Sequence, residues 1–165
     1  MGTWDTGHFD SDTAADFAAD LDAATVEGRT ELVRDALVRA TGTDGVPGGL
    51  DESAAVVAVA AAALVAAQCP GGPPVETVYG PDEPLPRFPG ELRGVAVLAL
   101  DRVLAEGSEL RELWVDAEGE AGPWWRGVVA LRTALAAAVA GAPDPIPAPI
   151  PAAIPELSGA VRPSV

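Results

Sequence analysis

The chain has 165 residues, which suits one domain with its own core, and its single cysteine excludes an internal disulfide. It carries 25 acidic residues and ten basic ones, for a net charge of −15 at pH 7. Such a field repels phosphate groups and attracts cations. We therefore expect no nucleic-acid partner and no membrane partner, whereas a basic protein partner fits.

The N-terminal third carries much of the negative charge and predicts two amphipathic helices. Residues 1–52 contain twelve acidic residues and three arginines. Apolar residues recur at spacings of three and four over residues 12–24, which predicts a first helix with Asp10 or Asp12 as its N-terminal cap. The same spacing over residues 30–41 predicts a second helix, which a short turn separates from the first.

The middle of the chain combines an apolar helix with a proline-rich segment. Residues 52–68 are apolar nearly all round after a capping Asp51, which predicts a helix at the centre of a bundle. Residues 70–89 contain seven prolines and show no helical periodicity. A connection of this length is uncommon inside a domain, and it predicts either an ordered strap across the surface or a functional loop.

Three more helices are expected to begin near Pro89, Ser108 and Pro123. After residue 142, proline alternates with other residues, which is typical of polyproline II or disordered chain. The sequence therefore predicts an all-α fold, a compact bundle of about six helices with a central Ala/Val-rich helix. This helical domain would occupy residues 1–142, and residues 143–165 would form a proline-rich flexible tail.

Two features of the sequence bear on location. The most apolar stretch, residues 54–67, is shorter than the roughly 20 residues that a membrane-spanning helix needs. The N-terminus shows no basic stretch that leads into a long apolar run, as a secretory signal would. We expect the protein to be cytoplasmic.

The first seventeen residues, Met1 to Phe17, form a distinctive motif. It contains a Met-Gly-Thr-Trp start, a Gly-x-Phe-Asp core and an Asp-x-Ala-x-Asp-Phe helix start. These elements resemble a bacterial family of unknown function, domain of unknown function 4259, and the resemblance continues through the helices to about residue 138. It implies a helical domain and supplies no catalytic residues.

The residues of this motif suggest three kinds of role. His8 is the only histidine, and Asp10, Asp12 and Asp16 follow it closely, so an imidazole and several carboxylates could meet a divalent metal ion. The spacing lacks the later ligands of a calcium-binding loop. Alternatively, Trp4 plugs into the bundle and an aspartate caps the first helix, or the same exposed acids form a ligand or partner surface.

The remaining reactive and aromatic residues give weaker indications of a function. Cys69 has no identifiable activating base and is expected to be a buried spectator thiol. No phosphate loop, dinucleotide motif or nucleophile elbow is present, so we expect no cofactor and favour a non-enzymatic role. Trp114, Trp124 and Trp125 are expected to pack in the core and at the bundle end, but Trp124 and Trp125 are adjacent and cannot both face inward. One of this pair would then be an exposed anchor for a partner, and Trp124 is a candidate binding residue.

Three functional hypotheses follow from the sequence. The first is a non-enzymatic acidic interaction module, an immunity-type or regulatory protein that binds a basic partner. The alternative is a small metal-dependent hydrolase or ligand-binding domain that uses the N-terminal His/Asp cluster. In a third, the proline tail is a ligand for an aromatic groove and the helical domain is its carrier.

Overall fold

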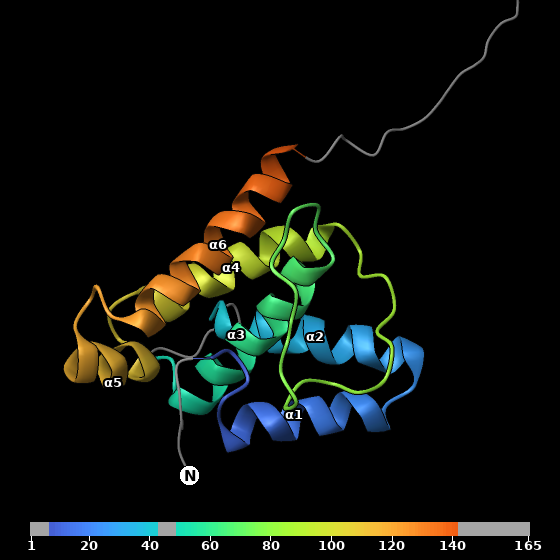
Figure 1. The fold of residues 1–165 in the computed structure, drawn as a ribbon, viewed down its shortest axis with the longest axis horizontal. Coiled ribbons are helices and arrows are strands. Elements are labelled where there is room, and N and C mark those ends of the chain that lie inside the picture. Colours follow the sequence, from blue (N-terminus) through green and yellow to red (C-terminus); the bar gives the residue numbers. More distant parts are fainter. Residues whose placement is uncertain (1–6, 43–48, 142–165) are drawn as a thin grey trace, which may run out of the picture.

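The computed structural model describes residues 7–42 and 49–141, and these residues form six helices without a β-strand (Figure 1). The all-α prediction is therefore confirmed. The helices are α1 (Asp12–Ala23), α2 (Val26–Ala40), α3 (Glu52–Ala67), α4 (Glu91–Leu104), α5 (Glu109–Glu118) and α6 (Pro123–Gly141).

Helix α3 lies at the centre of the bundle, as its apolar sequence predicts (Figure 1). Twelve of its 16 residues are buried, and it packs against each of the other five helices. Most of its side chains are alanine methyl groups, which allow neighbouring helices to approach closely on every side. Asp51 caps the helix as expected, because its carboxylate accepts a hydrogen bond from the N–H of Ala54 at 3.0 Å.

The start of α1 differs from the sequence prediction. Neither Asp10 nor Asp12 caps the helix; the cap is Ser11, whose hydroxyl accepts a hydrogen bond from the N–H of Ala14 at 3.1 Å. The reason is geometric, because the carboxylate of Asp10 turns back to accept the N–H of Gly7 at 3.0 Å. Ser11 then directly precedes the first helical residue in an extended conformation, which suits a cap.

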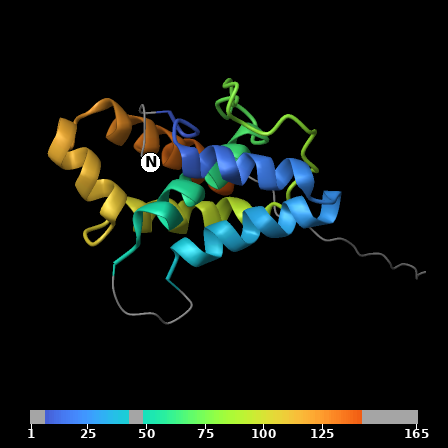
Figure 2. The same ribbon diagram turned by 90° about the horizontal axis from the view of Figure 1, so that it is seen from below.

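Helices α1 and α2 run antiparallel, side by side (Figure 2). The second helix starts at Val26 rather than near residue 30, because the hydroxyl of Thr25 accepts the N–H of Gly28 at 3.0 Å and caps it. Only Ala24 and Thr25 separate the two helices, so the hairpin is tighter than the sequence indicated.

The proline-rich segment of residues 70–89 is an ordered strap, which is the first of the two alternatives that the sequence left open. At its C-terminal end, the side-chain amide of Gln68 donates to the carbonyl of Pro86 at 2.8 Å and accepts the N–H of Phe88 at 2.9 Å. Phe88 is buried in the core. The strap is therefore fixed to the end of α3 by polar contacts and by an aromatic anchor.

A second set of contacts fixes the strap to the hairpin of α1 and α2. Arg29 is only 8% exposed, and its guanidinium donates to the carbonyls of Leu21 at 2.8 Å, Pro84 at 2.8 Å and Asp22 at 3.3 Å. The carboxylate of Asp22 accepts the N–H groups of Asp82 at 3.0 Å and Glu83 at 2.8 Å. Both charged side chains therefore bind the backbone of the strap. The prolines of the strap have no backbone N–H, so few of its backbone groups can hydrogen-bond with each other.

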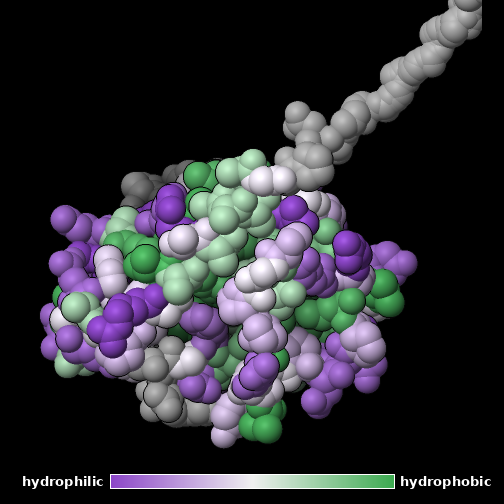
Figure 3. Space-filling model, turned by 45° about the horizontal axis from the view of Figure 1, so that its top comes forward, coloured by the Kyte–Doolittle hydropathy of each residue, from purple (hydrophilic) through white to green (hydrophobic). Residues whose placement is uncertain are grey.

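The last helix packs along α4, and an ion pair between Arg132 and Asp101 links the two. Its C-terminal half is rich in alanine, and Figure 3 shows a pale green, weakly hydrophobic stretch on this face of the molecule. Helix α6 ends at Gly141, and the predicted tail of residues 143–165 lies outside the described residues. Within the described part of the chain, no helix combines the length and the apolar character required to cross a bilayer.

Candidate functional site

His8 lies in the turn before α1 and is half-buried against α6. A Cβ atom at Gly127 of α6 would stand 3.6 Å from the His8 ring, so the imidazole packs over that glycine. Its Nδ1 atom is buried and has no hydrogen-bond partner in the described residues. Burial lowers the pKa of His8 below its ordinary value of 6.5, and the nearby carboxylate of Asp10 opposes this only in part. The imidazole is therefore neutral at pH 7.

The acidic residues of the opening motif do not gather around His8. Asp10 lies near the imidazole, but one of its oxygens is already bound to the N–H of Gly7. Asp12 and Asp16 are exposed on α1. Residues 7–42 and 49–141 contain no group of three or more His, Cys, Asp or Glu side chains placed to hold a metal ion. The metal-site hypothesis stays a prediction, and Trp4 lies outside the described residues.

A cavity of about 330 Å³ opens where the turn at His8 meets the strap. We call it the histidine cavity. Its polar lining comes from His8 and Asp10 on one side and from Glu76 and Thr77 of the strap on the other. The sequence did not identify the strap residues as part of this site, because the segment has no periodicity that would place them next to the opening motif.

Three tryptophans form a cluster beside His8. Trp114 of α5 and Trp124 of α6 stack with ring centroids 6.3 Å apart and planes 10° apart. Trp124 is 3% exposed, so it is the inner side chain of the adjacent pair and is not available as an exposed anchor. Trp125 is the outer member of the pair, and the guanidinium carbon of Arg111 lies 5.7 Å from its ring centroid.

A small cavity links this cluster to the histidine. It has a volume of about 20 Å³ and is lined by His8, Trp114 and Trp124, among others. The indole N–H of Trp114 is buried without a hydrogen-bond partner in the described residues, as is the Nδ1 atom of His8. A space of this size holds about one water molecule, which would satisfy both atoms if it bridged them.

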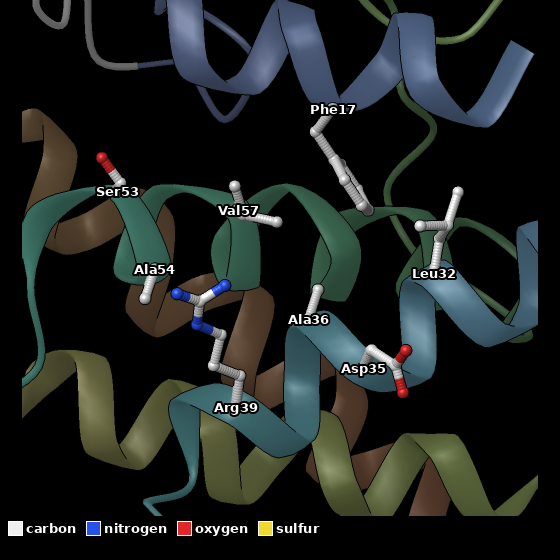
Figure 4. Close-up of a pocket in the computed structure, with 8 residues that line it drawn as sticks. All are labelled: Phe17, Leu32, Asp35, Ala36, Arg39, Ser53, Ala54 and Val57. Atoms are coloured by element: carbon white, nitrogen blue, oxygen red, sulfur yellow. The ribbon is translucent and has the colours of Figure 1, made fainter. Parts of the chain in front are cut away.

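A groove of about 240 Å³ lies between α1, α2 and the start of α3 (Figure 4). Phe17 projects into it from α1, and Arg39 turns its guanidinium from α2 toward α3 (Figure 4). Asp35 lies one helical turn before Arg39, yet among the described residues Arg39 forms no ion pair. We call this the interhelical groove; its apolar walls are Phe17, Leu32, Ala36, Ala54 and Val57.

Helix α1 presents an exposed row of carboxylates, which we call the α1 acidic row: Asp12, Asp16 and Asp20. A spacing of four residues places them on one side of the helix. In the described ranges no arginine pairs with them. The arginine ion pairs lie elsewhere, namely Arg34 with Glu31 and Glu91, Arg111 with Glu120, and Arg132 with Asp101.

The fold and these features define a small all-helical domain with one central alanine-rich helix, a polar cavity, an interhelical groove and an acidic helix face. The chain belongs to DUF4259, a family of domains of unknown function, whose model matches residues 2–127. This match covers the opening motif and ends within α6. No curated protein and no solved structure matches the chain significantly.

Proposed function

We propose that this protein is a non-enzymatic interaction module that binds a basic protein partner in the cytoplasm, in an immunity-type or regulatory role. The observation that carries the proposal is the α1 acidic row. Asp16 and Asp20 are exposed, lie four residues apart and have no cationic partner in the described residues. A bound partner that supplies lysine or arginine side chains would provide the missing counter-charge.

The energetics of α1 support this interpretation. Like charges four residues apart destabilise a helix by about 0.2–0.5 kcal/mol. Asp20 also lies in the last turn of α1, where the helix dipole is negative and disfavours a carboxylate. Asp22 lies in the same turn, but its carboxylate receives two N–H groups from the strap. Among residues 7–42 and 49–141, nothing compensates Asp20 in this way, and a basic partner would do so.

The interhelical groove gives such a partner an apolar contact next to the acidic row. Phe17 lines the groove, and Asp20 follows it by one turn on the same helix. Asp35 adds a carboxylate from α2. A basic segment with apolar side chains therefore fits both the charge and the surface chemistry. Arg39 is the only basic residue in the lining and would repel this partner, so Arg39→Ala is expected to strengthen binding.

The proposal is tested with two matched double variants. Asp16→Asn with Asp20→Asn removes two charges from α1, and Glu112→Gln with Asp116→Asn removes two exposed charges at the same spacing from α5. The two double variants therefore have the same net charge as each other. Tagged full-length proteins would be used to recover partners from a lysate of the source organism at low and high salt, with mass spectrometry of the eluates.

We expect a basic protein that the wild type and the α5 variant retain at low salt and that the α1 variant does not retain. High salt should release it, because interactions between exposed charges are screened. Equal loss with both variants would mean that only bulk charge matters, and recovery of no basic protein would refute the proposal. Retention by the α1 variant at the wild-type level would also refute it.

A further inference from the structure

The histidine cavity has a chemical character that no part of the proposed function uses. It is formed by the turn at His8, the start of the strap, Ala63 of α3 and Leu131 of α6. Its lining contains the carboxylates of Asp10 and Glu76 and no lysine or arginine. With a volume of about 330 Å³, it falls within the range of small-molecule sites in proteins.

Several acceptor atoms in this cavity have no donor in the part of the chain that the structure describes. The carboxylate of Asp10 uses Oδ2 for the N–H of Gly7, which leaves Oδ1 available. The carboxylate of Glu76 makes no hydrogen bond or ion pair within the described residues. A neutral imidazole at His8 adds no positive charge to this lining. The cavity therefore offers acceptors and negative charge to a ligand that brings N–H donors.

The remaining walls of the cavity are apolar. Phe9 and Leu131 belong to the core, and Val75 and two prolines of the strap line the cavity beside them. A bare metal ion would gain nothing from such walls, and the described residues provide no group of three metal-binding side chains. A cation on an alkyl stem would use both parts, because its methylene groups bury apolar surface while its head stays with the carboxylates.

We propose that the histidine cavity binds an organic cation, an ammonium or guanidinium group carried on an alkyl stem. The head group donates hydrogen bonds to the carboxylates of Asp10 and Glu76, and the stem lies along Phe9 and Leu131. None of the residues of the α1 acidic row lines this cavity. An experiment can therefore refute this proposal without refuting the binding of a protein partner at α1, and the reverse also holds.

The test uses the full-length chain and the ring resonances of His8, which are unambiguous because the protein has one histidine. n-Butylguanidinium is titrated into the protein at pH 7.5, with n-butylurea as a neutral control of the same shape. We expect the His8 resonances to shift saturably with n-butylguanidinium and not with n-butylurea. Equal shifts with both compounds, or no shift with n-butylguanidinium, would overturn the proposal.

Two variants of the strap locate the head group. Glu76→Gln is expected to weaken n-butylguanidinium binding about tenfold, as loss of one charge-assisted hydrogen bond implies. Glu83→Gln removes an exposed carboxylate from the same strap outside this cavity, and it should leave the affinity unchanged. Glu76 is exposed and makes no internal bond in the described structure, so its variant should fold normally. Equal affinities for Glu76→Gln and the wild type would exclude the proposed site.

A second titration distinguishes a free metabolite from an arginine side chain of another protein. Nα-acetyl-arginine N-methylamide carries the same guanidinium, with peptide groups on both sides of its Cα atom. If both this compound and n-butylguanidinium bind in their separate titrations, the ligand is identified as the side chain of a protein. Binding of n-butylguanidinium alone would identify a free small cation, because the cavity then excludes a peptide backbone.

Discussion

The contacts of Arg29 predict that this side chain is a main link between the strap and the helical hairpin, beside the contacts that Asp22 makes. Its guanidinium is buried and binds two carbonyls at the end of α1 and the carbonyl of Pro84 in the strap. No other cation lies in the strap's described contacts with this hairpin. Arg29→Met keeps the length and the apolar stem of the side chain and removes all of its donors.

The magnitude follows from the two shorter hydrogen bonds, both 2.8 Å long. A hydrogen bond from a charged group contributes about 1.5–3 kcal/mol, and the carbonyls left behind lose their donor. Taking the lower value for each bond, we expect Arg29→Met to reduce the free energy of unfolding by about 3 kcal/mol. In a domain of this size, that change lowers Tm by roughly 10 °C.

Arg34→Met is the matched control, because Arg34 lies on the same helix. Its partners Glu31 and Glu91 have side chains that are 63% and 69% exposed. Surface ion pairs of this kind contribute at most about 1 kcal/mol. Thermal and denaturant unfolding would measure both variants, and hydrogen exchange would follow the strap amides of Asp82 and Glu83.

Arg29→Met should destabilise the domain far more than Arg34→Met and should speed exchange at those two amides. Two results would refute the reasoning. One is an equal loss of stability in the two methionine variants. The other is a large loss of stability in Arg29→Met with unchanged hydrogen exchange in the strap. That result would mean that Arg29 stabilises the helical hairpin and does not hold the strap.

Two further predictions concern single ionisable residues of α1, and a third concerns His8. Asp20→Asn should raise the free energy of unfolding by about 0.5–1 kcal/mol at low salt, because it removes repulsion from Asp16 and from the helix dipole. Asp22→Asn should have the opposite effect, since two strap N–H groups lower the pKa of Asp22 below 3.8; its contribution is complete above pH 3.8 and is lost as the pH falls through the folded-state pKa. Chemical unfolding of both variants against pH would check these signs. For His8, whose pKa burial lowers below 6.5, stability should fall as the pH drops below 6.5, and His8→Gln should remove that part of the slope; an NMR pKa of 6.5 or above in the folded protein would contradict this.

The helices that the sequence predicted well are those whose signals are local. Residues 52–68 were predicted as a central helix from an apolar run and a capping Asp51, and Ser108 caps α5 as expected. The start of α2 was missed because Arg29 is buried there. A periodicity of apolar residues treats arginine as outward-facing, although carbonyl groups from two other segments can satisfy it inside the fold.

The candidate sites were harder to predict, because they depend on contacts between segments far apart in the sequence. Nothing near residues 70–89 indicates that Glu76 lies next to the opening motif, or that Asp22 binds the strap. The choice between Trp124 and Trp125 as the inner side chain depends on where α5 lies, since Trp114 stacks on one and Arg111 covers the other. Only the assembled bundle supplies that information.

The carboxylates of this protein fall into two groups, which bears on whether its charge serves solubility or binding. Some have a defined structural role, since Glu118 accepts the N–H of Trp124 at the start of α6 and Glu109 accepts the N–H of Glu52 at the start of α3. These acids stabilise helix N-termini, so part of the charge of −15 is explained by the fold.

The remaining exposed acids are not equivalent. Glu112 and Asp116 on α5 are also exposed and, like the α1 acidic row, form no ion pair with any described residue, so exposure alone does not mark a binding surface. What distinguishes α1 is that its row continues over three turns on the helix that also contributes Phe17 to the interhelical groove. If the charge served solubility alone, the α1 and α5 pairs would be interchangeable in every assay. A difference between them in partner retention is therefore the result that separates a binding surface from a solubilising one.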